Sequence, residues 1–251
     1  IVKEMKRYPV LILAYKRTTE LELALNSLKQ INPSIVYFHI HNAPENDIKG
    51  QRQVENVKKM IASYKGEKKV KYQKESLGIR KSMYSALEWV SSEQEVFFVW
   101  EDDIVLNPNS EKTIAKYMAR LEKEGGLLKL GEGRDSSVFW GWGATSTAVK
   151  QIINIDITSI AYENLLDKSI PKQDFVGLVE MYKRRRAIAW DDEFGFVVKI
   201  LGINQILSDT TMTDHIGYLS TRTTIHDKGF GVDSHVTYIN GVLVPQENDN
   251  A

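Results

Sequence analysis

The feature that most constrains the fold is an alternation of strand-like and helix-like segments along the N-terminal part of the chain. The strand-like segments are residues 9–14, 35–40, 70–72 and 96–100. Segments with apolar residues on one helical face separate them, at residues 19–28, 47–64 and 78–90. A helix between two strands returns the chain to the edge where it started, so successive strands become parallel. We therefore expect an α/β fold, with a mainly parallel central sheet and helices on both faces.

The pattern changes in the second part of the chain. One more helix is expected over residues 109–123, and glycine-rich and aromatic segments follow it. A long, less regular tail covers residues 209–251. Because no repeat, low-complexity linker or domain boundary is visible, we expect one domain over residues 1–251. Its two halves would be a nucleotide-type half, 1–104, and a mixed, loop-rich half, 105–251.

Composition excludes several classes of protein. Lys plus Arg and Asp plus Glu both total 33, so the formal net charge is zero and gives no global case for binding nucleic acid or an anionic membrane. No apolar stretch reaches the about 18 residues of a membrane span. The chain has no cysteine and no Asn-x-Ser/Thr sequon, which suits a cytoplasmic bacterial protein. Because the chain begins at Ile1, an upstream anchor or domain stays open, and with it the Golgi lumen as the alternative compartment.

Three acids stand directly after the apolar run at residues 96–100. Glu101, Asp102 and Asp103 would therefore lie at the C-terminal end of a central strand, where open α/β sheets bind ligands. Clustered carboxylates stay ionised together only beside positive charge, and their oxygens suit Mg²⁺ or Mn²⁺. The alternative is a solvated acidic turn that caps the next helix, which Asn109 would begin.

Cations and a glycine follow two other predicted strands. Arg17 precedes a helix whose start is predicted by the capping-box pattern of Thr19 and Glu22, so it could bind a phosphate at that helix N-terminus. Gly78 would let backbone approach a ligand closely, and Arg80 could meet a phosphate or a base. The alternatives are a surface arginine and a plain helix start with solvated cations. Neither GxGxxG nor GxxxxGK[ST] occurs, which disfavours Rossmann cofactors and P-loop chemistry.

Two tryptophans lie among glycines at residues 139–143. Trp140 and Trp142 could stack on the apolar faces of a sugar, with Gly143 leaving the backbone uncrowded. The alternative is that both are core residues at alternating positions of a strand.

The last candidates are two acids and a histidine. Asp191 and Asp192 follow Trp190 at the start of a predicted helix, where one of them could act as a general base. The helix dipole alone also favours acids in a first turn. His215 lies in a glycine-containing segment and could bind metal or phosphate, although a single histidine is more often structural.

Taken together, these motifs in this order resemble those of the GT-A glycosyltransferases. The likeness is greatest to the inverting N-acetylglucosaminyltransferase that begins complex N-glycans and to related bacterial sugar transferases. It covers residues 9–222, as short motifs separated by unmatched stretches. It implies that Tyr15 and Arg17 lie at the donor diphosphate. It also implies that Asp103, the last acid in the EDD form of the DxD signature, binds the Mn²⁺ that bridges the diphosphate, with Glu101 and His215 as further metal-side candidates.

The same resemblance assigns roles to the other motifs. Residues 139–143 resemble the Gly-Trp loop below the donor sugar, and Trp190-Asp191-Asp192 resembles a W-D-D segment whose second acid, here Asp192, is the base. Asn42 stands where relatives often carry an Asp that reads uracil. Asp102, Gly78 and Arg80 would complete the donor side.

The expected function is a metal-dependent glycosyltransferase that moves a sugar to an acceptor hydroxyl with inversion. The expected cofactor is Mn²⁺ or Mg²⁺, and the donor is a UDP-sugar, with UDP-N-acetylglucosamine as the nearest candidate. The partner would be a glycan or glycoconjugate acceptor, and not nucleic acid, with membrane contact only through an absent segment or the acceptor. A loop within residues 218–233 could close over the donor.

Two other functions stay open. A nucleotidyltransferase also uses carboxylate-bound metal at a strand end, but it would carry a glycine-rich basic loop after the first strand. Residues 15–19 contain no glycine. The third reading is a non-catalytic glycan-binding module on the same fold.

Overall fold

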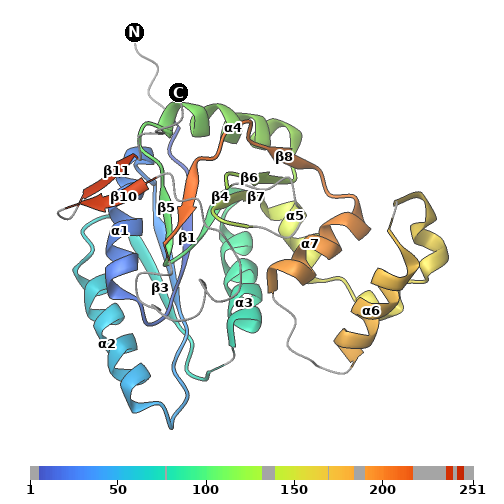
Figure 1. Cartoon of the computed structure of the whole chain (residues 1–251), viewed down its shortest axis with the longest axis horizontal. Helices are drawn as coiled ribbons and strands as arrows, with labels where there is room; N and C mark the ends of the chain where they lie inside the picture. Colours follow the sequence, from blue (N-terminus) through green and yellow to red (C-terminus); the bar gives the residue numbers. More distant parts are fainter. Residues whose placement is uncertain are drawn as a thin grey trace.

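A seven-stranded sheet forms the centre of the molecule (Figure 1). The computed structural model describes residues 6–76, 78–131, 139–168, 170–183, 190–216, 236–239 and 242–245. The strands lie in the order β3-β2-β1-β4-β7-β6-β8. Their bounds are β1 Val10–Ala14, β2 Val36–Ile40, β3 Lys68–Tyr72, β4 Val96–Glu101, β6 Leu127–Lys129, β7 Trp142–Thr145 and β8 Gln205–Leu207.

All strands of this sheet except β7 run in one direction. β1 pairs in parallel with β2 and β4, β2 pairs in parallel with β3, and β6 pairs in parallel with β8. β7 lies between β4 and β6 and is antiparallel to both. The α/β class with a mainly parallel sheet is therefore confirmed. The carboxyl ends of β1, β2 and β4 consequently meet at one edge, where parallel sheets bind ligands.

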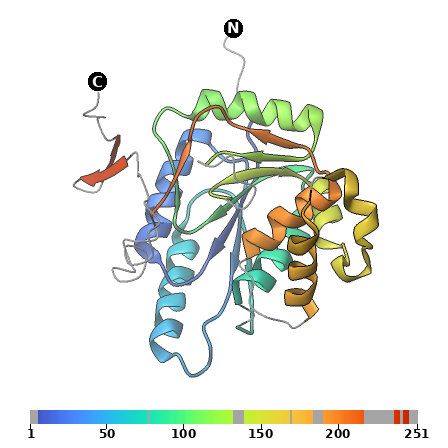
Figure 2. The same cartoon turned by 45° about the vertical axis from the view of Figure 1, so that its right-hand side comes forward.

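Helices cover both faces of the sheet (Figure 1; Figure 2). One face packs against α1 Thr18–Leu28, α2 Ile48–Ser63 and α4 Glu111–Glu124. The other face packs against α3 Gly78–Glu93, α5 Ser146–Ile153 and α7 Trp190–Leu201. Strand β1 shows why both faces need cover. Its side chains alternate between the two cores, with Ile12 in the first and Leu11 and Leu13 in the second, so the strand is apolar throughout.

The remaining elements lie around this sandwich. β5 Ile104–Leu106 pairs antiparallel with β9 Thr213–His215, and β10 Val236–Ile239 pairs with β11 Val242–Pro245. α6 Lys172–Lys183 projects beside α7 (Figure 1). Three short 3₁₀ segments complete the described elements, at Lys29–Ile31, Ile157–Ser159 and Tyr162–Lys168.

Two predicted helix starts were wrong by a residue or two. α1 begins at Thr18 and lacks a side-chain cap, because its N-cap residue, Arg17, has no side-chain acceptor. α4 begins at Glu111, because Asn109 has a φ of 63° and cannot be helical. In the described part of the chain, no helix is both long and apolar enough to cross a bilayer. The predicted closing loop, residues 218–233, lies outside the described residues.

Candidate active site

The acidic segment lies where β4 ends, directly beside the end of β1. Leu13 of β1 is the register partner of Glu101, the last residue of β4. Asp102 and Asp103 form the turn that follows, and β5 begins at Ile104. The chain after β1 therefore crosses in front of the three acids. This adjacency explains why residues separated by more than eighty positions in sequence share one site.

Arg17 provides the positive charge in this acidic turn. Its Nη1 donates to Asp103 Oδ2 and, at 3.3 Å, to Asp102 Oδ1. The other oxygen of Asp102 accepts a hydrogen bond from the Tyr15 N–H at 2.8 Å. The Asp102 and Asp103 side chains are 6% and 3% exposed, whereas Arg17 is 34% exposed. Two buried carboxylates thus share a cation that keeps contact with solvent.

His215 and Trp140 approach the same carboxylate from the second half of the chain. His215 Nε2 lies 3.1 Å from Asp103 Oδ2. The pairing of β5 with β9 holds it there, with the Ile216 N–H donating to the Asp103 carbonyl at 2.8 Å. The Trp140 ring stacks on the His215 ring, with centroids 5.4 Å apart and planes 29° apart. The predicted metal-side histidine and one predicted tryptophan are therefore brought together.

The electrostatics of the site are dominated by burial of carboxylates. The pKa of Glu101 is raised to about 7, first by burial and then by the charge of Asp102, with a smaller contribution from Asp191; His215 and Arg17 oppose this rise. Burial also raises the pKa of Asp102, which the Arg17 guanidinium opposes. The pKa of His215 is lowered by burial, against the pull of Glu101. The site therefore holds more carboxylates than its one permanent cation, Arg17, can balance.

The donor set of Asp103 fits a hard divalent cation. Its Oδ1 is buried and accepts no hydrogen bond, which is costly for a carboxylate oxygen unless a cation satisfies it. Among the described residues, no three His, Asp or Glu side chains converge on one metal position. Mg²⁺ at nucleotide sites typically takes one or two carboxylates and completes its shell with phosphate oxygens and water. Asp103 could serve as such a single protein ligand.

Sequence reasoning missed two residues of this site. Glu20 is 1% exposed, its Oε1 accepts no hydrogen bond, and its charge raises the pKa of Asp102. Glu20 lies three residues after Arg17, about one helical turn. This spacing in the sequence could have predicted that Glu20 belongs to the site. His41 stacks on Tyr15 with ring centroids 4.0 Å apart. Burial, followed by the charges of neighbouring cations, lowers the pKa of His41 to about 4, so its ring is neutral at neutral pH.

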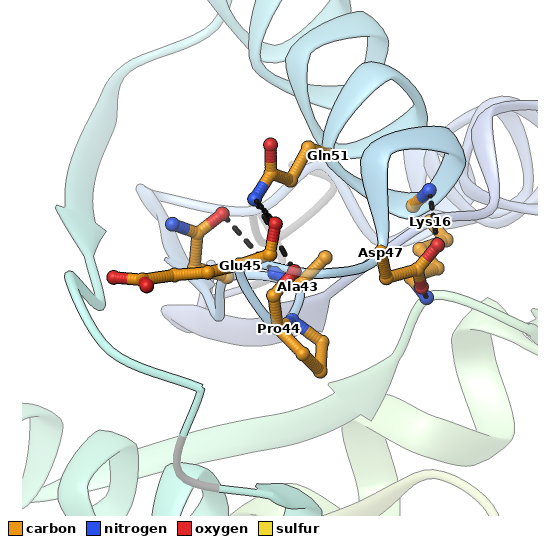
Figure 3. A network of polar contacts seen from close by, with 8 residues as sticks. Lys16, Ala43, Pro44, Glu45, Asp47 and Gln51 are labelled. Carbon is orange, nitrogen blue, oxygen red and sulfur yellow. Dashed lines mark hydrogen bonds and ion pairs between the residues drawn. The ribbon is translucent and has the colours of Figure 1, made fainter.

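The connection that follows β2 is held to α2 by side chains (Figure 3). Gln51 Nε2 donates to the carbonyl oxygens of Pro44 and Glu45 at 3.2 and 3.0 Å. Lys16 forms an ion pair with Asp47, which is also the N-cap of α2. The network joins the connection after β1 to the connection after β2, at the edge where the acids lie.

The predicted base-reading side chain links two strand ends. Asn42 Oδ1 accepts from the Ala43 N–H at 3.1 Å, and its Nδ2 donates to the Lys74 carbonyl at 3.3 Å. Gly78 begins α3 with a φ of 74°, and the space around it is open. The glycine is thus required by its backbone conformation and not by crowding. Donor contacts of Asn42 and Gly78 stay predictions.

The prediction that Trp142 stacks on a sugar was wrong. Trp142 is 1% exposed and packs against Phe139 and Phe194, with ring centroids 5.4 and 5.1 Å away. It lies on the face of β7 that α7 covers, so no sugar can reach its ring. Gly143 is also explained by packing, because a Cβ there would lie 2.9 Å from the Met118 sulfur on α4. Trp140 differs in being partly exposed, and its ring stacks on His215, which lies beside Asp103.

Arg80 does not point at the acidic cluster. It forms an ion pair with Glu193 on α7, a contact that the sequence did not reveal because the partners are 113 residues apart. A prediction of phosphate binding by Arg80 therefore conflicts with its existing partner. A cavity of about 630 Å³ opens at the opposite end of the sheet between α4 and α5, and none of the predicted site residues line it.

The two candidate bases lie in the first turn of α7. The helix begins at Trp190, as predicted, and Asp191 lies near enough to Glu101 to raise its pKa. The side chain of Asp192 lies outside the described residues. The start of α7 is nevertheless brought to the acidic turn of β4.

Similarity of this chain to known proteins was found among solved structures, at low sequence identity. No protein-family model matches it, and a search of curated proteins found no match. Solved structures with partial similarity include a 4-diphosphocytidyl-2C-methyl-D-erythritol synthase from Anaerococcus prevotii, with 11% identity and a TM-score of 0.44 over 80% of this chain and 88% of that one. TarS from S. aureus has 16% identity and a TM-score of 0.47 over 83% and 60%. A mannosyltransferase from Pyrobaculum calidifontis, solved with GDP-Man and Mn²⁺, has 13% identity and a TM-score of 0.45 over 86% and 60%. At these values none of the three is evidence for the activity of this chain.

The raised pKa of Glu101 predicts a pH-dependent cost of folding. With an ordinary pKa of 4.5 when unfolded and about 7 when folded, the folded state holds a proton that the unfolded state loses, so stability falls as pH rises through this window. Glu101→Gln mimics the protonated form. In buffer with a metal chelator, its free energy of unfolding relative to wild type should rise by about 2–3 kcal/mol between pH 5 and pH 8. Chemical denaturation measures this, and Glu75→Gln, at an exposed glutamate, is the control. Identical pH profiles for Glu101→Gln and wild type would show that Glu101 ionises normally.

Proposed function

We propose that this protein is a metal-dependent glycosyltransferase that transfers a sugar from a nucleotide donor, with a UDP-sugar as the expected donor, to an acceptor hydroxyl with inversion. The observation that carries the proposal is the acidic turn after β4, where Asp103 has one buried oxygen with no hydrogen bond and Arg17 at the other. A carboxylate for a divalent cation and an arginine for phosphates are together the set that a nucleoside diphosphate needs. Residues 1–104 would bind the donor, and residues 105–251 would provide the acceptor side.

The protein groups at this site have separable roles in such a reaction. A bound Mg²⁺ or Mn²⁺ on Asp103 would stabilise the negative charge of the departing diphosphate. Arg17 would donate charge-assisted hydrogen bonds to the same phosphates, because it is the exposed partner of its ion pair. Asp102 would keep the backbone at Tyr15 in place through its existing hydrogen bond. Trp140, supported by His215, would form the floor below the donor sugar.

The acceptor hydroxyl needs a base on the face of the sugar opposite the diphosphate. The first turn of α7 supplies two acids, and the W-D-D resemblance assigns the role to Asp192. Attack from that face, with proton transfer to the carboxylate, inverts the anomeric centre. Asp191 lies beside Glu101 and would add negative charge near the anomeric carbon, where positive charge develops.

The proposal is tested by assaying product formation with a panel of UDP-sugars and acceptors, with Mn²⁺ or with chelator. Asp192→Asn should lower turnover by about 10²-fold or more, the usual scale for loss of a general base, with little change in donor affinity. Asp191→Asn is the matched control and should be less impaired. If Asp191→Asn is the more impaired variant, Asp191 is the base and the two roles are exchanged. Full activity of both variants would exclude a base in this turn, and release of pyrophosphate from a nucleoside triphosphate and a sugar phosphate would support nucleotidyl transfer instead.

Removal of the Arg17 charge should have opposite effects on two ligands. Arg17→Ala should weaken the binding of UDP by about 1.5–3 kcal/mol, the contribution of charge-assisted hydrogen bonds, and leave the binding of uridine unchanged. It should also strengthen binding of Mn²⁺ to the protein without nucleotide, because Arg17 no longer occupies Asp103. Calorimetry for the nucleotides and electron paramagnetic resonance for free Mn²⁺ measure the two effects. Arg120→Ala, at an exposed arginine of α4, should change neither. Equal losses for UDP and uridine would mean that Arg17 does not touch phosphate.

A further inference from the structure

The first turn of α7 is joined to α3 by a buried ion pair. Arg80 Nη2 donates to Glu193 Oε1 at 2.6 Å, and Arg80 Nε donates to Glu193 Oε2, so the contact is bidentate. The Glu193 side chain is 2% exposed, whereas Arg80 is 34% exposed. The Tyr84 hydroxyl lies 3.5 Å from the same carboxylate, and the guanidinium lies over its ring. Both views place α7 beside α3 (Figure 1; Figure 2).

A neighbouring face of the same turn is held by aromatic packing. Trp190 and Phe194 lie one helical turn apart, and both pack against Phe139, with ring centroids 5.9 and 5.1 Å away. Glu193 and Asp191 lie roughly 200° apart around the helix. The ion pair therefore fixes the rotation of α7 without covering the face that carries Asp191 toward Glu101.

Apolar packing alone does not set the spacing of α3 and α7 at this point. A pocket of about 230 Å³ opens beside the ion pair, with Lys81, Ile152 and Val197 among its lining residues. The helix dipole would favour an acid in this turn without burying it. A buried bidentate pair contributes little net stability compared with apolar residues of the same size, but it specifies one arrangement of the elements that it joins. The Arg80–Glu193 pair thus has the properties of a positioning contact.

We propose that Arg80 and Glu193 are positioning residues, which hold the first turn of α7 so that its acids reach the acceptor hydroxyl. The inference rests on the proposed function, because it assigns the pair a role in the same transfer reaction. It also replaces the donor contact that the sequence predicted for Arg80. Neither side chain touches the reacting atoms, so the expected effect is on turnover and not on donor binding.

The kinetic test uses variants that keep or remove the bidentate contact. Arg80→Ala and Glu193→Gln should lower kcat by about 10–10²-fold, the scale of a displacement of about 1 Å in a catalytic group. The KM for the donor should change by less than about twofold, since the donor side is untouched. Arg80→Lys keeps the charge but loses the planar fork, so it should recover part of the turnover.

A second ion pair at the other end of α3 provides the matched control. Glu93 pairs with Lys69 of β3 and also accepts from Tyr37 and Trp89. Glu93→Gln should lower the melting temperature and leave kcat unchanged. If Arg80→Ala and Glu193→Gln behave in the same way, the pair is only structural and the proposal fails. If Arg80→Ala raises the donor KM with an unchanged kcat, Arg80 contacts the donor and the proposal also fails.

Hydrogen exchange separates this proposal from the proposed function. Arg80→Ala and Glu193→Gln should speed amide exchange in the first turn of α7 by about tenfold or more, because the turn loses its attachment to α3. Glu93→Gln should not. This readout needs no substrate. Unchanged exchange in both variants overturns the positioning role. Faster exchange in the variants, together with no sugar transfer by the wild-type protein, would keep the attachment of α7 and reject the transferase.

Discussion

The contact of Arg17 with Asp102 and Asp103 is the interaction on which the site depends. Three carboxylates enter a largely buried turn at the end of β4, and burial of like charges is unfavourable unless a cation is near. Arg17 can supply that cation because β1 and β4 are neighbours and their carboxyl ends coincide. The order of the central strands therefore also serves the electrostatics of the site, because it places Arg17 beside the acids.

Arg17 balances the charge of these carboxylates only in part. The raised pKa of Glu101 and the unpartnered oxygens of Asp103 and Glu20 indicate that the site holds more carboxylates than Arg17 can balance. A divalent cation would relieve this excess and would also release Arg17 to bind phosphate. Under the proposed function, the imbalance that makes folding less favourable at neutral pH would be relieved when a metal and a diphosphate bind.

The elements that could be predicted from sequence are those encoded locally. The apolar run before Glu101, the acids themselves and the start of α7 at Trp190 depend on neighbouring residues, and each prediction was confirmed. Predictions that depend on tertiary packing failed. Trp142 lies among glycines, as a sugar-stacking tryptophan would, but α7 covers the face of β7 on which its ring lies. Glu193 reads as a helix-start acid, and only the approach of α3 and α7 gives it Arg80 as a partner.

The central claim is that the acidic turn binds a nucleoside diphosphate through a metal on Asp103. Calorimetric titration of UDP into wild type and Asp103→Asn, each with Mn²⁺ and with chelator, tests it most directly. The account predicts that wild type binds UDP tightly only with Mn²⁺, and that Asp103→Asn, folded by circular dichroism, loses this metal-dependent gain. Equal UDP affinity for the two proteins in Mn²⁺ would contradict it.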